Sequence, residues 1–217
     1  MYLCLETATR NCSVALINDN VLVDLFEREE NEFVHAEALH QMMKDILDRN
    51  NLKPTDLTGI AVGIGPGSYT GLRIGVTAAK GLAYALNIAM TPTTTGELLV
   101  NSVRSETGFI PVALIDARRN DAYVYVNGSW SFATLNEEWR ANLGVEKAIF
   151  VGDAAFKVND FMWKEDEVKA ISPSAQHFIG LLPNSSATFE EHMAQVEPFY
   201  MKDFVPTESK KKNKWIS

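Results

Sequence analysis

The stretch Gly63-Ile64-Gly65-Pro66-Gly67-Ser68-Tyr69-Thr70-Gly71-Leu72-Arg73-Ile74-Gly75 decides the fold of this chain. The apolar run from Gly59 to Ile64 leads into it without alternation and between turn signals, which predicts a buried strand. The glycines of the turn allow positive φ or close backbone approach, and Pro66 fixes one φ. Ser68 or Thr70 can then cap the helix that follows.

Two interpretations of this turn remain open. A strand, a glycine turn and a helix N-terminus together point amide N–H groups at the space above the loop, which makes an anion site possible. The other interpretation is a tight strand-to-helix turn without a ligand. The common phosphate-binding sequences are absent, because no Gly-Lys-Ser/Thr follows and Gly-x-Gly-x-x-Gly fails at Thr70. The candidate phosphate residues of this loop are Gly65, Gly67, Ser68, Thr70 and Arg73.

The two helices nearest the turn carry apolar residues on more than one side. The helix predicted from Tyr69 to Asn87 has one large apolar face and a second face of mostly small residues: Ile74, Ala78, Gly81 and Ala85. The helix predicted from Val34 to Asn50 spreads its apolar side over about half its circumference, with His35, Leu39, Met42, Met43, Ile46 and Leu47. Each helix therefore needs two covers. We expect the sheet on one side and a neighbouring helix, in this chain or in a partner, on the other.

Composition sets the outer limits. The chain has 217 residues, of which 46% are hydrophobic and 22% charged, so it is long enough for a substantial core and for two lobes. It has no apolar run of about 18 residues and no signal-peptide features, and Cys4 and Cys12 fit reduced core thiols in the cytoplasm, although strand pairing could bring them together. A net charge of −8 argues against binding nucleic acid alone. The basic tail at 210–214 is read as a solvated terminus, with RNA contact as the alternative.

The order of patterns predicts two similar lobes. Residues 2–7, 12–18 and 21–27 read as an antiparallel meander, 88–91 as a short strand and 95–103 as a helix capped by Thr94 or Thr95. The pattern restarts near residue 107, with strands at 112–116 and 122–127, a helix at 136–143, a strand at 148–152 and a helix at 174–182. We therefore divide the chain into lobes at 1–106 and 107–217. The segment 196–201 is expected to return to the first lobe, and the last eight or so residues to be disordered.

The two hairpins can be aligned as an internal repeat. Glu6 falls on Asp116, Arg10-Asn11 on Arg119-Asn120, and Asn18 on Asn127, with one residue removed from the turn. Chance similarity between hairpins is the rival explanation.

A duplicated fold of this kind would place the two strand-end carboxylates opposite each other across a cleft. There the hairpin turns can meet phosphates and the acids can hold a metal-bound water. On this interpretation Thr7, Thr9, Asp116 and Arg118 join the phosphate candidates. The alternative is that Glu6 and Asp116 are strand-end residues that bond their own turns.

No catalytic residue and no metal ligand is expected. His35 and His40 are five residues apart, so they do not share a helix face, and His177 and His192 have no cysteine or acidic neighbour at ligand spacing. A Gly-x-Ser-x-Gly nucleophile motif is also absent.

Together these residues closely resemble the bacterial TsaB (YeaZ) family. The resemblance runs in order through nearly the whole chain and is strongest up to about residue 127. It is carried by Leu5-Glu6-Thr7-Ala8-Thr9, Cys12-Ser13-Val14-Ala15-Leu16, Gly65-Pro66-Gly67-Ser68-Tyr69-Thr70-Gly71-Leu72-Arg73-Ile74-Gly75, Ala79-Lys80-Gly81-Leu82-Ala83, Ile115-Asp116-Ala117-Arg118 and Glu197-Pro198-Phe199-Tyr200-Met201.

The resemblance implies an α/β fold of the actin/Hsp70/sugar-kinase class, built from two ribonuclease-H-like lobes. It also implies a noncatalytic scaffold for TsaD, which transfers the threonylcarbamoyl group to the adenosine beside the anticodon of tRNAs reading A-starting codons, with the ATPase TsaE joining the complex. On this reading the chain forms a homodimer when alone, meets tRNA only through the complex and binds no membrane.

The resemblance further implies how the chain departs from its catalytic relatives. In those subunits a His-x-x-x-His pair holds the metal, whereas this chain has Thr93-Thr94-Thr95-Gly96-Glu97-Leu98-Leu99 in that place. No cofactor is therefore expected, apart from weak ATP or ADP binding that would favour the interface of the complex. Glu6 stands where the family usually has aspartate, which puts any inherited phosphate or metal geometry in doubt.

In this family the helices of the first lobe pack against their counterparts in a homodimer or in TsaD. The helices from His35 to Leu47 and from Ile74 to Ala85 are therefore predicted to form the interface, driven by burial of Met42, Met43 and Ile46. A bulky charge at Ala78 is expected to block association and leave the monomer folded. The competing hypotheses are an active nucleotide hydrolase or metallopeptidase of the same fold, and a binding module unrelated to tRNA.

Overall fold

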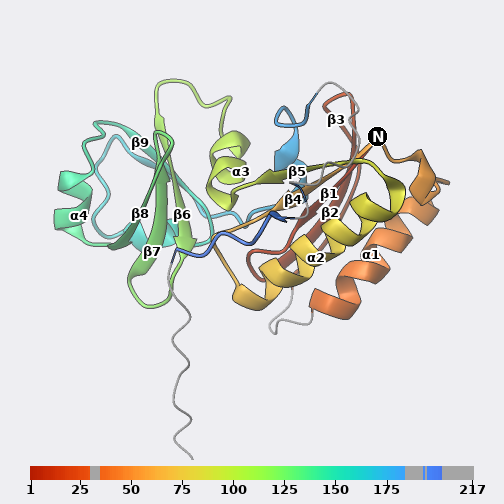
Figure 1. The fold of residues 1–217 in the computed structure, drawn as a ribbon. Helices are drawn as coiled ribbons and strands as arrows, with labels where there is room; N and C mark the ends of the chain where they lie inside the picture. The colour runs from red at the N-terminus through yellow and green to blue at the C-terminus, as the bar shows by residue number, and fades with distance from the viewer. Residues whose placement is uncertain (30–34, 184–192, 194, 202–217) are drawn as a thin grey trace, which may run out of the picture.

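Two five-stranded mixed sheets lie side by side in the computed structural model, which describes residues 1–29, 35–183, 193 and 195–201 (Figure 1). The first sheet has the strand order β3-β2-β1-β4-β5. The bounds are β1 Tyr2–Glu6, β2 Asn11–Asn18, β3 Val21–Glu29, β4 Gly59–Gly63 and β5 Ala89–Thr93. The predicted antiparallel meander is confirmed as β1 to β3, and β4 and β5 continue parallel to β1.

The second sheet repeats this arrangement in the order β8-β7-β6-β9-β10. The bounds are β6 Ile110–Asp116, β7 Asp121–Val126, β8 Ser129–Thr134, β9 Ala148–Val151 and β10 Glu167–Lys169. Three antiparallel strands are again followed by two parallel ones. The same topology in both sheets supports duplication over chance similarity and gives the two-lobe fold of the actin/Hsp70/sugar-kinase class.

The alignment of the two hairpins holds for the strands and shifts by one residue at the far turn. Glu6 pairs with Ser13 and Asp116 with Ala122, as the alignment requires. The next turn is made by Asp19 and Asn20 in the first lobe, both at positive φ, but by residues 127 and 128 in the second. The turn therefore starts one residue earlier in the second lobe than the match of Asn18 with Asn127 implies.

Helices α1 (His35–Arg49) and α2 (Tyr69–Leu86) lie next to each other on one face of the first sheet (Figure 1). Helix α2 begins at the glycine turn, where the Ser68 Oγ accepts a hydrogen bond from the Gly71 N–H at 3.2 Å. Ser68 is thus the cap, and Thr70 is exposed. Helix α2 ends at Asn87, which adopts the left-handed conformation with φ 53°.

The other face of the first sheet is covered by a helix that also contacts the second sheet and by a short helical turn. Helix α3 (Thr95–Ser102) begins with a capping box between Thr94 and Glu97. It lies between the sheets, with Leu98 in the core of the first and Leu99 in the core of the second (Figure 1). The helix predicted at 174–182 is only a short 3₁₀ turn, η3 (Ala175–Phe178), because its cap hydrogen bonds close after one turn.

The segment 196–201 returns to the first lobe and bridges the two. The Phe199 N–H donates a hydrogen bond to the Ile64 carbonyl at 2.7 Å, and its ring lies 5.7 Å from that of Trp130 in β8. Residues 173–182 also pack on the first sheet, although they follow the second sheet in sequence. The division of the chain at residue 106 stays a prediction. Residues 210–217 lie outside the described residues.

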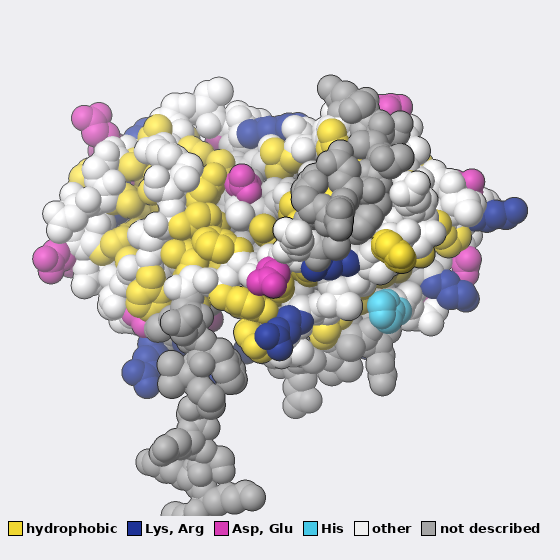
Figure 2. All heavy atoms as spheres, in the orientation of Figure 1, with side chains coloured by type: hydrophobic (Ala, Val, Ile, Leu, Met, Phe, Trp, Pro, Cys, Tyr) yellow, Lys and Arg dark blue, Asp and Glu magenta, His cyan; other side chains and the backbone are white. Residues whose placement is uncertain are grey.

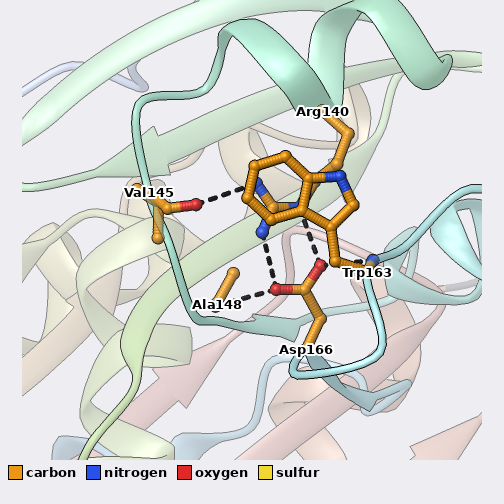
Figure 3. A network of polar contacts seen from close by, with 5 residues as sticks. All are labelled: Arg140, Val145, Ala148, Trp163 and Asp166. Atoms are coloured by element: carbon orange, nitrogen blue, oxygen red, sulfur yellow. Dashed lines mark hydrogen bonds and ion pairs between the residues drawn. The ribbon is translucent and has the colours of Figure 1, made fainter.

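The second lobe has its own core, anchored by a buried ion pair (Figure 3). Its helical elements are α4 (Glu137–Asn142) and η2 (Ala155–Val158), while η1 (Pro54–Asp56) belongs to the first lobe. The Arg140 guanidinium, fully buried, donates to both carboxylate oxygens of Asp166 at 2.7 and 2.6 Å and to the Val145 carbonyl at 2.9 Å. Its Cζ lies 3.8 Å from the centre of the Trp163 ring.

Cys4 and Cys12 are both free and buried, but they belong to the cores on opposite faces of the first sheet, so strand pairing does not bring them together. Among the helices of the described residues, none combines the length and apolar character needed to cross a bilayer.

Candidate functional site: a helix groove and the interlobe carboxylates

The glycine turn is packed tightly against the β1–β2 turn. The Ser68 N–H donates to the Ala8 carbonyl at 2.6 Å, and a Cβ at Gly67 would lie 2.3 Å from that same oxygen. Gly65 has φ +103°. The fold therefore needs close backbone approach at Gly67 and positive φ at Gly65, which are the two properties expected of these glycines.

Two of the threonine hydroxyl groups proposed for phosphate binding have partners inside the protein. Thr7 Oγ1 donates to the Gly71 carbonyl at 2.8 Å, and Thr9 Oγ1 accepts from the Asn11 N–H at 3.3 Å. Both threonines are buried. Their side chains fasten the β1–β2 turn and the first turn of α2, which favours the interpretation of this loop as a strand-to-helix turn. The phosphate role stays a prediction.

The strand-end carboxylates bond their own turns in the same way in both lobes. Glu6 Oε1 accepts from the Ala8 N–H at 2.6 Å, and Asp116 Oδ1 accepts from the Arg118 N–H at 2.9 Å. Asp116 is half exposed and pairs with the Lys157 ammonium at 2.5 Å, while Arg118 is exposed at a turn with φ +72°. Both acids therefore bond their own turns, while their part in phosphate or metal binding stays a prediction.

The interlobe space also holds an acid that the sequence analysis missed. Asp153, just after β9, accepts from the Asp116 N–H at 2.9 Å. Burial raises its pKa to about 6, and the Asp116 carboxylate adds to the effect. Burial likewise raises the pKa of Glu6 to about 7, with a further contribution from Asp153, against hydrogen bonds from the Ala8 and Thr7 N–H groups. Glu6 Oε2 is buried without a partner in the described residues.

The sequence did contain a signal for Asp153. Gly152-Asp153 directly follows the buried strand β9, so Asp153 is a carboxylate at a strand end, as Glu6 and Asp116 are. Lys157, one turn further along, carried no such signal, because its pairing with Asp116 depends on how η2 folds back.

A groove of about 710 Å³ lies between α1 and α2 on their outer side. Its walls are apolar and small-residue side chains with a few polar groups at the rim: His40, Met43, Arg73, Ile74, Thr77, Ala78, Gly81, Leu82 and Ala85. In the face shown in Figure 2, hydrophobic side chains are exposed both over α2 and over the second sheet. The groove is open in the monomer, so the two helices leave apolar surface exposed on their outer side. This surface is where the expected second cover of the helices would pack.

The structure divides the predicted interface residues into two groups. Met43, Ile74, Ala78, Gly81 and Ala85 line the groove. Leu39, Met42 and Ile46 do not, because they are buried against the first sheet in the monomer. The prediction that Met42 and Ile46 drive association is therefore wrong. The side chain of His35 lies outside the described residues.

The Ala78 prediction also needs correction. Ala78 is only 9% exposed and belongs to the core, so a bulky charge there would disturb the monomer itself. Gly81 is the better probe, because it is exposed and a Cβ added there meets no atom within 4 Å.

The residues of the segment 93–99 cap α3 or pack in the core. Thr94 and Glu97 cap α3, Thr95 is buried, and Leu98 and Leu99 are both fully buried between the lobes. His40 lies at the groove rim, and His177 Nδ1 accepts the Ser174 N–H at 3.3 Å. Within the described part of the chain, no three His, Cys, Asp or Glu side chains are arranged to hold a metal ion.

The chain matches known proteins over most of its length. The model of the TsaD family, described as tRNA N6-adenosine threonylcarbamoyltransferase, matches residues 29–197. The tRNA threonylcarbamoyladenosine biosynthesis protein TsaB of Escherichia coli is 38% identical over 122 residues, which are 56% of this chain and 52% of that protein. TsaB of Bacillus subtilis is 35% identical over 133 residues, covering 58% and 56%. The chain thus spans about half the length of the curated relatives it matches.

Solved structures agree with the fold. One described as YeaZ from Pseudomonas aeruginosa is 26% identical with a TM-score of 0.65, and covers 83% of this chain and 89% of that one. A second, an uncharacterized protein with similarity to peptidase YeaZ from the same organism, is 26% identical with a TM-score of 0.71, and covers 93% and 99%.

The two lobes, with the same sheet topology in each, define a chain of the actin/Hsp70/sugar-kinase class, and this chain belongs to the family that the TsaD model describes. More narrowly, the chain belongs to the TsaB (YeaZ) family.

Proposed function

We propose that this chain is a noncatalytic subunit of the complex that makes threonylcarbamoyladenosine in tRNA. It would support a TsaD-type transferase, with a TsaE-type ATPase, in modifying the adenosine beside the anticodon of tRNAs reading A-starting codons. The observation that carries the proposal is the open apolar groove between α1 and α2, in a chain of the TsaB family. The work would take place in the cytoplasm, where the tRNA substrates are.

The groove suits a helix of another subunit. Ala78, Gly81 and Ala85 recur along one side of α2, and small residues let two helices approach closely. The walls are mostly apolar, so that docking a partner helix would remove hydrophobic surface from water. A second copy of the chain could use the same surface when the partner is absent, which is how we interpret the expected homodimer.

The noncatalytic role is supported by how the chain uses the segment 93–99. Its threonines cap and pack α3, and its leucines fill the core between the lobes, so these positions contribute to folding.

The alternative is an active nucleotide hydrolase or metallopeptidase of the same fold. The observation that favours this alternative is the oxygen of Glu6 that is buried without a partner in the described residues, close enough to Asp153 for their charges to interact. ATP turnover and metal content of the isolated chain distinguish the two hypotheses.

The groove is tested by Gly81→Arg. The arginine side chain projects from an exposed, uncrowded position into the groove, so we expect affinity for the TsaD-type subunit to fall by at least about ten-fold, equivalent to 1.4 kcal/mol. Binding is measured by titration calorimetry. Gly81→Ala should bind like the wild type and raise helix stability by up to about 1 kcal/mol. Tyr84→Arg adds the same charge outside the groove and should also bind normally. Wild-type affinity in Gly81→Arg would exclude the groove as the binding surface.

A further inference from the structure

Arg73 is the one Arg, Lys, Asp or Glu among the groove's lining residues in the described parts of the chain, and its guanidinium is held in place from two sides. Its Cζ lies 4.0 Å from the centre of the Tyr69 ring, one helical turn earlier. Its Nε donates a hydrogen bond to the Tyr200 hydroxyl at 3.2 Å. The Tyr69 and Tyr200 rings are themselves 4.9 Å apart. The result is a clamp of two tyrosines around one arginine.

The clamp joins two parts of the chain that are far apart in the sequence. Tyr200 follows Phe199, whose N–H is bonded to the Ile64 carbonyl and whose ring contacts Trp130 in the second sheet. The segment 196–201 is thus fixed to both lobes just before it reaches Arg73. Because the arginine is held before any partner arrives, less side-chain entropy is lost when it forms a contact.

The clamp leaves the guanidinium of Arg73 accessible to a ligand. Its Nε donates to the Tyr200 hydroxyl and the Tyr69 side chain also contacts it, but the residue as a whole is exposed. Arg73 is exposed at the rim of the groove. Two parallel N–H donors of a guanidinium match the two oxygens of a carboxylate, and such charge-assisted pairs are about twice as strong as neutral ones.

We propose that Arg73 is the residue that sets the register of the partner helix, by pairing with an aspartate or glutamate on it. The partner segment is then an apolar helix that carries one acidic residue at the Arg73 end of the groove and small or apolar residues against Ala78, Gly81 and Ala85. This inference rests on the proposed function of the groove and adds the chemistry of its occupant. Apolar contact gives the affinity, and the ion pair selects the partner and its position.

The test is the affinity of the full chain for the TsaD-type subunit, measured by calorimetry at about 50 mM and about 500 mM salt. Wild-type affinity should fall several-fold with added salt, because an ion pair at the rim is screened. Arg73→Gln should bind about ten-fold more weakly at low salt and lose the salt dependence, and Arg73→Glu should be weaker still. Tyr200→Phe removes only the hydroxyl that positions Nε and should cost about two- to three-fold.

Lys80→Gln is the matched control, since it removes a positive charge from the same helix outside the groove lining, and it should bind like the wild type at both salt concentrations. An acidic-to-arginine change at the paired position of the partner helix should restore binding to Arg73→Glu. Wild-type binding by Arg73→Gln at low salt, with Gly81→Arg still blocked, would overturn the role of Arg73 and leave the groove intact. Normal binding by Gly81→Arg would instead remove the proposed function.

Discussion

Replacing Asp166 with alanine is expected to lower the free energy of unfolding by about 3–5 kcal/mol. The change removes the carboxylate that accepts both hydrogen bonds from the buried Arg140 guanidinium (Figure 3). It also leaves the N–H groups of Ala148 and Trp163 without their acceptor, since these donate to Asp166 at 3.0 and 2.8 Å. A buried charge that has lost its partner is far more costly than the net value of the intact pair. Urea unfolding followed by tryptophan fluorescence measures the change.

Glu165→Ala provides the control, because it removes a carboxylate from an exposed neighbouring position and should alter stability by less than about 0.5 kcal/mol. The double change Arg140→Met with Asp166→Leu should be less damaging than Asp166→Ala alone, since both charges are then absent. A loss below about 1 kcal/mol in Asp166→Ala would show that the ion pair contributes little to the second lobe.

Replacing Glu6 with glutamine is expected to raise stability above neutral pH by about 3 kcal/mol. In the unfolded chain this carboxyl ionises near its ordinary pKa of 4.5, whereas burial raises its pKa in the folded state to about 7. Between those values the folded state binds more protons than the unfolded one. The free energy of unfolding therefore falls as pH rises from about 4.5 to about 7, and the loss is complete above that range. Glutamine keeps an acceptor for the Ala8 N–H and cannot ionise.

Unfolding curves of the wild type and Glu6→Gln at pH values across this range make the comparison. The two proteins should be similar at about pH 4.5 and diverge towards about pH 8, with the variant the more stable. Asp153 contributes a slope in the same direction, because its pKa is also raised, to about 6, so Asp153→Asn should remove part of the remaining dependence. Parallel pH profiles for wild type and Glu6→Gln would mean that Glu6 ionises normally in the folded chain.

Patterns with a local physical cause could be predicted from the sequence. The apolar run before the glycine turn, the Thr94–Glu97 cap and the antiparallel meander of the first lobe each depend on neighbours in the chain, and each is found as expected. Strand β8 was missed although Asn127-Gly128 is a strong hairpin signal, followed by alternation of Trp130 and Phe132. Strand β10 has only three residues and no comparable signal.

The candidate site shows where sequence reasoning fails. Periodicity indicated that α1 has apolar residues over half its circumference, but it could not say which of them face the sheet. Met42 is buried against the first sheet, whereas Met43, the next residue, lines the groove. Which of the two methionines faces the groove depends on how α1 packs against α2. The Arg73 clamp could not be predicted from the sequence either, because it depends on a contact between Arg73 and Tyr200, which are 127 residues apart.

The most direct test of the central claim is a reconstituted threonylcarbamoyl transfer assay with tRNA, a TsaD-type transferase, a TsaE-type ATPase and this chain. We expect tRNA modification to require the chain, to proceed normally with Gly81→Ala and to fall by at least about ten-fold with Gly81→Arg at limiting concentrations of the chain. Modification that is independent of the chain, or that is equally rapid with Gly81→Arg, would contradict a scaffold that acts through the groove between α1 and α2.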